Sequence, residues 1–199
     1  MADGLRGSRT RNKLLCAASA LLLEGGPAAV TVRAVGAAAG VARMTPYRHF
    51  KDKDELLSAI AAQNLEYLWA AMHEGASDSG KEISPLYGAC LGYVKAAMER
   101  PAHYRLVFGD FQIARPSMPL QETAAKCMNY LYELVGQAQS QRAQHRDLDV
   151  RSETALIWAT LHGMVDLTLT AHMREPITID GASSMALIVK RVLAALELI

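Results

Sequence analysis

Residues 31–57, which read TVRAVGAAAGVARMTPYRHFKDKDELL, limit what this chain can fold into. The Thr31 hydroxyl can accept a hydrogen bond from an otherwise unpaired backbone N–H at the start of a helix. Gly40 can adopt the left-handed conformation that ends a helix and turns the chain. Asp52, with Glu55 three residues later, has the spacing of a capping box. The stretch predicts two short helices joined by a glycine turn, followed by the start of a longer helix.

The second of these helices, predicted over residues 42–50, has one apolar side. At 100° per residue, Pro46 and Phe50 fall on the face that must meet Val35 and Ala39 of the preceding helix. The outward face and its flanks carry Arg43, Met44, Thr45, Tyr47, Arg48 and His49. A protruding helix held by a tight turn is the arrangement of a helix-turn-helix, whose second helix enters the major groove.

The outward side chains suit contacts with DNA. Arg43 or Arg48 can pair with guanine O6 and N7, and Met44 or the Thr45 methyl group can touch a thymine methyl. The side chains suited to phosphates are Tyr47, His49, Arg33 and Lys53, the last at a helix start where backbone N–H groups also favour an anion. Charge alone favours a plainer interpretation, a solvated face on an ordinary helical hairpin.

Positive charge is concentrated at the start of the chain. Residues 1–53 hold nine Lys/Arg and three acids, a net of +6, which leaves −5 for the remainder because the whole chain carries +1. A basic first quarter on a mildly acidic body indicates a polyanion partner for that quarter. Basic N-termini are also common without any such partner.

Length and composition set broad limits. The 199 residues suffice for one or two domains with a buried core, and 51% apolar with 21% charged residues is ordinary for a soluble globular protein.

Cys16, Cys90 and Cys127 stand far apart in apolar contexts, which predicts buried free thiols in a reducing compartment. The apolar run at 14–23 is too short to span a bilayer, and the N-terminus lacks the pattern of a signal peptide. We therefore expect a cytoplasmic protein without a membrane partner.

Helical periodicity continues through the rest of the chain. Helices are predicted over residues 8–24, 53–73, 84–100, 101–109, 119–144, 150–173 and 181–198. Residues 1–7 are expected to be disordered, 75–80 and 110–118 to form loops, and 177–179 to form a linker. With the hairpin this makes an all-α protein, with residues 1–55 as a three-helix DNA-binding domain and 56–199 as a six-helix body. The boundary falls inside the helix that begins at Lys53.

The first quarter resembles the DNA-binding domain of the tetracycline-repressor (TetR) family of bacterial transcription regulators. The matching strings are LLCAA at 14–18, EGG at 24–26, TV at 31–32, AGV at 39–41, YRHF at 47–50, and Lys53 with LL at 56–57. The resemblance implies an all-helical homodimer with a ligand-binding and dimerisation domain, and DNA contacts at Arg43, Met44, Thr45, Tyr47, Arg48, His49 and Lys53. Two departures stand out: Ala42, where the family often has a capping Ser, and Pro46, where Leu or Ile is usual.

The body resembles a TetR-type C-terminal domain marked by a Trp…His-Gly element, through residues 99–108 and 158–163. In such regulators the last two helices usually form a four-helix dimer interface. One stripe consists of Leu156, Ala159, Gly163, Leu167 and Thr170, and the other of Val189, Val192, Leu193 and Leu196. Both stripes would equally suit the core of one protomer. A two-fold dimer would read a palindromic operator with half-sites about one helical turn apart.

Large or adaptable side chains in the body can line a ligand pocket between helices. The candidates are Tyr93, Met98, Tyr104, Phe108, Met128, Tyr132, Trp158 and His162. Each of them would also suit an ordinary core position. His162 and Asp166 can form a hydrogen-bonded pair at an interface or, less simply, a metal or acid–base pair. No third ligand stands at metal spacing, so we expect neither metal nor cofactor.

The sequence thus predicts a DNA-binding transcriptional regulator, a repressor released from its operator by a small-molecule effector. An all-helical enzyme or small-molecule carrier is the first alternative, but it needs a nucleophile with a base, or paired carboxylates, and no such motif is recognisable. We therefore expect no enzyme activity. A pure interaction protein is the second alternative, which predicts neither pocket nor effector.

Overall fold

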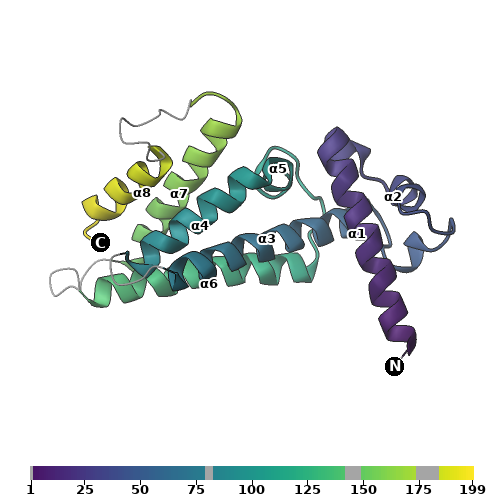
Figure 1. Cartoon of the computed structure of the whole chain (residues 1–199), viewed down its shortest axis with the longest axis horizontal. Helices are drawn as coiled ribbons and strands as arrows, with labels where there is room; N and C mark the ends of the chain where they lie inside the picture. Colours follow the sequence, from purple (N-terminus) through teal and green to yellow (C-terminus); the bar gives the residue numbers. More distant parts are fainter. Residues whose placement is uncertain (1, 79–82, 142–148, 174–183) are drawn as a thin grey trace. The chain divides into compact units, whose positions relative to one another are not determined.

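A computed structural model describes residues 2–78, 83–141, 149–173 and 184–199, and every regular element within these ranges is helical (Figure 1). This confirms the all-α class. The elements are α1 (Ala2–Ala29), α2 (Val32–Ala38), the 3-10 helix η1 (Pro46–Arg48), α3 (Lys53–Ser77), α4 (Pro85–Glu99), α5 (Pro101–Phe108), α6 (Met118–Ser140), α7 (Val150–Leu169) and α8 (Ser184–Ala195). Within the described ranges, no helix has the length and apolar character needed to cross a membrane.

The chain packs as two compact units. Unit 1 contains Met1–Glu66 and Arg100–Ala124, and unit 2 contains Tyr67–Glu99 and Ala125–Ile199. Helices α3 and α6 contribute to both units, because the chain passes from one unit to the other within each of them. The expected functional division into residues 1–55 and 56–199 remains a prediction, since unit 1 also takes in the next turns of α3, all of α5 and the start of α6.

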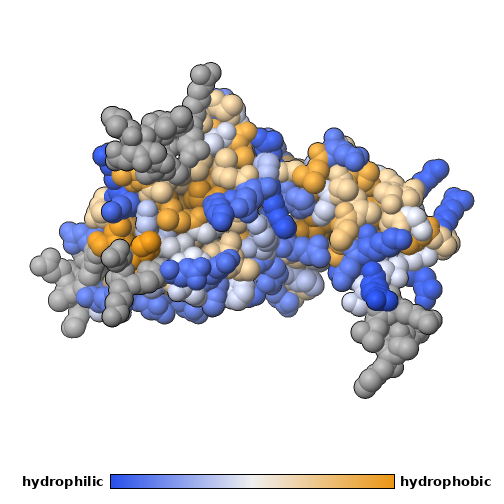
Figure 2. All heavy atoms as spheres, in the orientation of Figure 1, coloured by the Kyte–Doolittle hydropathy of each residue, from blue (hydrophilic) through white to orange (hydrophobic). Residues whose placement is uncertain are grey.

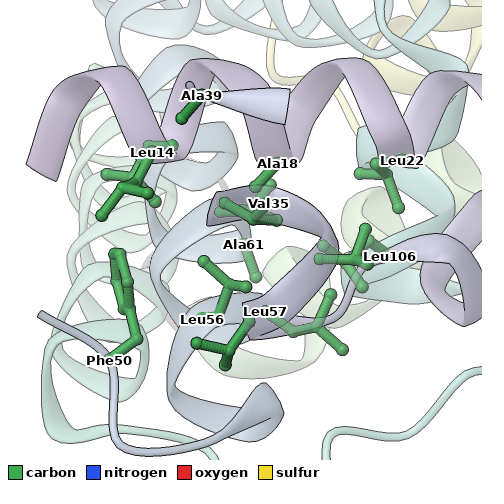
Figure 3. Close-up of a cluster of buried hydrophobic side chains, with 14 residues drawn as sticks. Leu14, Ala18, Leu22, Val35, Ala39, Phe50, Leu56, Leu57, Ala61 and Leu106 are labelled. Atoms are coloured by element: carbon green, nitrogen blue, oxygen red, sulfur yellow. The ribbon is translucent and has the colours of Figure 1, made fainter. Parts of the chain in front are cut away.

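An apolar cluster forms the core of unit 1 (Figure 3). Helix α1 contributes one buried side, with Leu14 and Leu22 at most 1% exposed. It meets Val35 from α2 and Phe50 from the segment before α3, and Leu56, Leu57 and Leu106 close the cluster (Figure 3). Burying each large apolar side chain contributes about 1.5–3 kcal/mol, so this cluster is the main source of stability for the hairpin.

Helix α1 begins earlier than expected, at Ala2, and the prediction that residues 1–7 are disordered is wrong for residues 2–7. No proline interrupts this segment, so the backbone continues the helix towards the N-terminus. The predicted stop is confirmed, because Gly25 and Gly26 leave helical geometry and Gly26 has φ 63°. A last short turn through Pro27 completes the element.

Helix α3 continues to Ser77, so the loop predicted to start at Gly75 is wrong at that position. A Cβ atom at Gly75 would lie 2.2 Å from the carbonyl oxygen of Gly88 on α4, and one at Gly92 would lie 2.1 Å from the carbonyl oxygen of Ala71. These glycines therefore allow the backbones of α3 and α4 to touch. Gly75 is therefore a helix-packing residue. The small and polar residues around it in the sequence are more typical of a loop.

In unit 2, α4 packs against α7 and α8, which also contact each other (Figure 1). Side chains cap the starts of α4 and α7: Ser84 Oγ accepts from the backbone N–H of Tyr87 at 3.2 Å, and Asp149 Oδ1 accepts from that of Arg151 at 3.1 Å. Helix α7 ends at Leu169, before the predicted Met173. The linker predicted at 177–179 and the predicted start of the last helix at 181 lie outside the described residues.

Candidate nucleic-acid interface

The turn between α2 and η1 follows the local chemistry of its residues. The Thr31 hydroxyl accepts from the backbone N–H of Ala34 at 3.1 Å, which confirms the predicted cap. Gly40 has φ 59°, the left-handed conformation that glycine adopts without strain. The backbone N–H of Val41 then returns to the carbonyl of Gly36 at 3.2 Å. The turn is therefore closed by backbone bonds as well as by the glycine.

The element after the turn differs from the α-helix predicted over residues 42–50. It is a 3-10 helix, Pro46–Arg48, preceded and followed by single turns. An α-helix would need the residue at 46 to donate to the carbonyl of Ala42, and proline has no N–H. That carbonyl instead accepts from Thr45 at 2.8 Å, three residues on. Pro46 thus selects the tighter 3-10 pattern.

Two side chains anchor this element, as the sequence predicted. Pro46 is buried against Gly36, where a Cβ atom would lie 2.5 Å from the proline Cγ. Phe50 is 1% exposed within the core of unit 1, and the guanidinium carbon of Arg11 lies 5.2 Å from its ring centroid. The segment between these anchors is therefore held firmly from its inner side.

The opposite side of the segment faces solvent. Met44 is 67% exposed and Tyr47 is 47% exposed, which is high for such large side chains. Arg33, Arg43 and Arg48 are also exposed, while Thr45, His49 and Lys53 are half-buried. All eight sequence-predicted DNA contacts thus belong to unit 1 and keep accessible surface, and their contacts with DNA remain predictions.

The start of α3 is capped as expected. Asp52 Oδ1 accepts from the backbone N–H of Glu55 at 3.0 Å. Glu55 Oε2 accepts from the backbone N–H of Lys51 at 2.7 Å, one residue before the position that a standard capping box uses. This arrangement fixes the first turn, which carries Lys53.

The loop between α5 and α6 is a neighbour of this turn that was not predicted from the sequence. Arg115 forms ion pairs with Asp52 and Asp54, and the Lys53 ammonium lies 5.9 Å from the ring centroid of Phe111. Asp52 and Asp54 were the signal that could have indicated it, because two carboxylates in an otherwise basic stretch are expected to pair with a basic residue.

The expected dimer stripes have different surroundings in unit 2. On α7, Leu156 is 51% and Leu167 is 45% exposed, and a Cβ atom at Gly163 would meet nothing within 4 Å. On α8, Val189 and Leu193 are at most 2% exposed and face a small void beside Cys90, so they serve the core of unit 2. The remaining predicted residues are Ala159 and Thr170, which are exposed, and Val192 and Leu196, which are half-buried. Figure 2 shows apolar surface over α7 and α8.

Three of the predicted pocket residues come together. The ring centroids of Trp158 and His162 lie 4.0 Å apart, and Tyr93 lies 5.8 Å and 5.6 Å from them. His162 Nδ1 donates to the Trp158 carbonyl at 3.0 Å, so Nε2, 3.2 Å from the Tyr93 hydroxyl, accepts from it. Burial lowers the pKa of His162, and the bond to the carbonyl opposes this shift only in part. A neutral imidazole within an aromatic cluster results.

The other pocket candidates are dispersed. Tyr104 and Phe108 pair with each other in α5, at 5.0 Å between centroids, and belong to unit 1. Met98, Met128 and Tyr132 are half-buried in unit 2. A cleft of about 430 Å³ in unit 2 contains none of the eight candidates. It is lined by residues of α3, α4 and their connection: Tyr67, Ala70, Ala71, Glu74, Gly75, Asp78, Ile83, Gly88, Leu91, Gly92, Lys95, Ala96 and Glu99.

The three cysteines differ in their exposure. Cys90 and Cys127 are buried free thiols, and burial raises the pKa of Cys90 to about 12. Cys16 is exposed, so the expectation of a buried thiol is wrong there, because it lies on the outer side of α1 while Leu14 and Leu15 face the core. Among the residues that the structure describes, no group of three His, Cys, Asp or Glu side chains could hold a metal ion.

Comparison with known families identifies this arrangement. Residues 14–60 match the bacterial regulatory proteins of the tetR family, and residues 86–192 match the tetracyclin repressor-like C-terminal domain. The chain belongs to the tetR family. It is accordingly a transcriptional regulator with an N-terminal helix-turn-helix and a helical ligand-binding domain, and not an enzyme.

Solved structures of tetR-like fold superpose over nearly the whole chain. A protein of unknown function from Rhodococcus sp. RHA1 is 23% identical with a TM-score of 0.74, covering 94% of this chain and 91% of its own. A tetR family transcription regulator from Marinobacter aquaeolei VT8 is 19% identical with a TM-score of 0.69, covering 98% of each chain. The fatty acid degradation regulator FadR from Bacillus halodurans is 17% identical with a TM-score of 0.67, covering 94% of this chain and 93% of its own.

Proposed function

We propose that this tetR-family regulator is a homodimeric repressor that reads a palindromic operator with the segment 41–50 of each protomer and is released by a small molecule. The observation that supports this proposal is that the segment has one buried side and one exposed side. Its inner side chains, Pro46 and Phe50, are buried, while Met44 and Tyr47 project with the neighbouring arginines. An exposed, basic edge held by a buried anchor is what groove reading requires.

The roles within the edge follow from side-chain chemistry. Arg43 and Arg48 supply the planar donors that pair with guanine, and Met44 and Thr45 supply methyl groups for thymine. Phosphate contacts come from Tyr47, His49, Arg33 and Lys53, since a hydroxyl, an imidazole or a cation can each bind a phosphate oxygen. These contacts position the protein, whereas the first four residues give it sequence preference.

The exposed face of α7 supports a dimer. Leu156 and Leu167 would remain half-exposed in a single protomer, and Ala159 and Gly163 between them leave room for a second helix. Large exposed apolar side chains around small residues are typical of a helix that packs against another copy. The half-buried Val192 and Leu196 of α8 border this proposed interface, while Val189 and Leu193 support it from the core.

A cleft in unit 2 supports a small-molecule effector. The cleft of about 430 Å³ in unit 2 has the size of ligand sites in proteins. The Tyr93–Trp158–His162 cluster also supports assignment of the C-terminal part to the type marked by Trp…His-Gly, because His162 bonds the Trp158 carbonyl directly. Compounds that release DNA can be mapped to the cleft with Ala70→Trp, which would fill it, and to the cluster with Trp158→Leu.

The operator contact is tested with Arg48→Ala. DNA is first selected from a random-sequence pool, and a palindrome is expected for a two-fold dimer. Loss of a bidentate guanine contact should weaken binding by about 1–3 kcal/mol and relax the preference at that base pair. Arg105→Ala is the matched control, because Arg105 is an exposed arginine of the same unit on α5, outside the proposed edge. Equal losses in both variants, or no loss in Arg48→Ala, would contradict the assigned role.

A further inference from the structure

The loop between α5 and α6, residues 109–117, is fastened to the first turns of α3. Arg115 Nη2 lies 3.1 Å from Asp52 Oδ2, and its Nε lies 3.3 Å from Asp54 Oδ2. The backbone N–H of Ser117 donates to the hydroxyl of Ser58 at 3.1 Å, and Ser58 is fully buried. The loop therefore contacts the cap of α3 at Asp52 and the helix itself at Asp54 and Ser58, all within unit 1.

The fastened turn carries a proposed phosphate contact between two acids. Asp52 and Asp54 flank Lys53 in the sequence, and their side chains are 33% and 23% exposed, respectively. Uncompensated carboxylates beside Lys53 would repel a phosphate, because charges within about 10 Å still interact at 0.1 M salt. The formal charges of residues 52–54 sum to −1, and Arg115 brings the net charge of the group to zero.

The two oxygens of Asp52 serve separate functions. Its Oδ1 accepts the capping bond from Glu55, while its Oδ2 faces Arg115. Arg115 can thus neutralise the carboxylate without disturbing the helix cap. Phe111 of the same loop lies beside the Lys53 ammonium, at 5.9 Å from its ring centroid, where the ring face attracts a cation only weakly. Lys53 is steadied there and stays available to a stronger anion.

We propose that Arg115 is a positioning residue for operator binding, which raises DNA affinity by neutralising Asp52 and Asp54 beside Lys53. It acts through these carboxylates, not through a phosphate contact of its own. This role rests on the DNA contact proposed above for Lys53. It makes the α5–α6 loop part of the DNA-binding machinery, although none of its residues belongs to the helix-turn-helix.

A mutant cycle in the full-length protein tests this role. Arg115→Ala should weaken binding to the selected operator by about threefold to tenfold at about 0.1 M salt, since one screened charge is left unbalanced. The loss should shrink as salt rises, because it is Coulombic. Arg115 is 71% exposed, so the thermal midpoint should change little. Arg115→Lys should restore part of the affinity, and Arg105→Ala is the charge-matched control.

The decisive background is Asp52→Asn with Asp54→Asn. Asparagine has the same shape and can still cap α3 through its side-chain oxygen. If Arg115 acts by balancing the carboxylates, the triple variant with Arg115→Ala in this background should bind the operator at least as tightly as the wild type, because the charges at residues 52–54 and 115 then sum to +1. A triple variant that binds as weakly as Arg115→Ala alone would overturn the inference, because removing the carboxylates would then not compensate for the lost arginine. No loss in the single variant would overturn it as well.

Arg48→Ala in the same assay separates the possible failures. If Arg48→Ala weakens binding and Arg115→Ala does not, only the role of Arg115 is wrong. If neither variant changes affinity, the DNA-reading edge itself is wrong, and the role of Arg115 is overturned with it.

Discussion

Two surfaces of this molecule expose large side chains, and they differ in how they do so. The edge around η1 projects Met44 and Tyr47 among arginines, over an inner side formed by Pro46 and Phe50. The outer face of α7 projects Leu156 and Leu167 from a regular helix, with Ala159 and Gly163 between them. The first surface is basic and tightly turned, whereas the second is apolar and regular.

The difference indicates two kinds of partner. Phosphates and base edges need cations and donors at fixed positions, which the closely packed 3-10 turn supplies. A second copy of the chain needs apolar surface and room for close approach, which small residues on a helix supply. The close packing of the turn around η1 in unit 1 and the small residues on the outer face of α7 in unit 2 can therefore each be tested by a single substitution.

The largest effect is expected from Gly163→Leu. A Cβ atom there meets nothing in the protomer, so the substitution should not destabilise it and should add helix propensity of about 1 kcal/mol. In a two-fold dimer the added side chains would clash twice, and we expect the dimer dissociation constant to rise by about 100-fold. Analytical ultracentrifugation over a concentration series measures this directly.

Gly136→Leu is the control for that measurement. A Cβ atom at Gly136 also meets nothing within 4 Å, but this glycine lies on α6, outside the proposed interface. We expect Gly136→Leu to dimerise as the wild type does. If Gly163→Leu also dimerises like the wild type, the outer face of α7 is not the contact between protomers. The assignment of this apolar surface to a second copy of the chain would then be wrong.

A smaller effect is expected from Gly36→Ala, which tests the stiffness of unit 1. The new methyl group would lie 2.5 Å from Pro46 Cγ, so η1 must shift. Overpacking of this kind should lower the free energy of unfolding by about 1–3 kcal/mol and weaken operator binding with it. Thermal unfolding and DNA titration check both. Gly7→Ala, where the methyl group meets nothing, should leave DNA affinity unchanged. Unaltered DNA affinity in Gly36→Ala would show that the edge needs no fixed anchor.

The smallest effect concerns pH and compares two histidines, the buried His103 in unit 1 and the half-buried His162 in unit 2. Burial lowers both pKa values, with a further contribution from Arg100 at His103. The unfolded chain therefore binds protons at higher pH than the folded chain. The free energy of unfolding should fall as pH drops below about 6.5 towards the folded pKa values, and neither group should matter above that range.

His162→Gln and His103→Gln should each remove part of this pH dependence. Urea unfolding followed by circular dichroism, at about pH 5.5 and 7.5, measures the difference in the free energy of unfolding. A smaller difference is expected in each variant than in the wild type. An unchanged difference in both variants would mean that other groups cause the acid sensitivity.

Features that depend on neighbouring residues were predicted correctly from the sequence. Thr31 and Asp52 cap helices, and Gly40 is left-handed, because each acts through backbone groups a few residues away. The inward orientation of Pro46 and Phe50 follows from helical spacing, which a 3-10 turn changes only slightly. The family resemblance supplied the fold of the body, where periodicity alone could show only that it is helical.

Features that depend on distant residues were not predictable in this way. Gly75 resembles a loop residue until the carbonyl of Gly88 is found against it. Val189 and Val192 look alike in sequence, yet only the first is fully buried. The missing α-helix at η1 has a local cause, because Pro46 has no N–H and therefore cannot give the carbonyl of Ala42 the donor that an α-helix requires.

The placement of the aromatic residues makes the molecule its own optical probe. The chain has two tryptophans, Trp69 and Trp158, and both belong to unit 2. Trp69 lies 3.5 Å from the Lys126 ammonium, measured to its ring centroid, and Trp158 packs on His162. Indole fluorescence therefore reports on unit 2 alone, whereas far-ultraviolet circular dichroism reports on the helices of both units. Any separation between the two signals during denaturation measures directly how independently the DNA-reading unit folds.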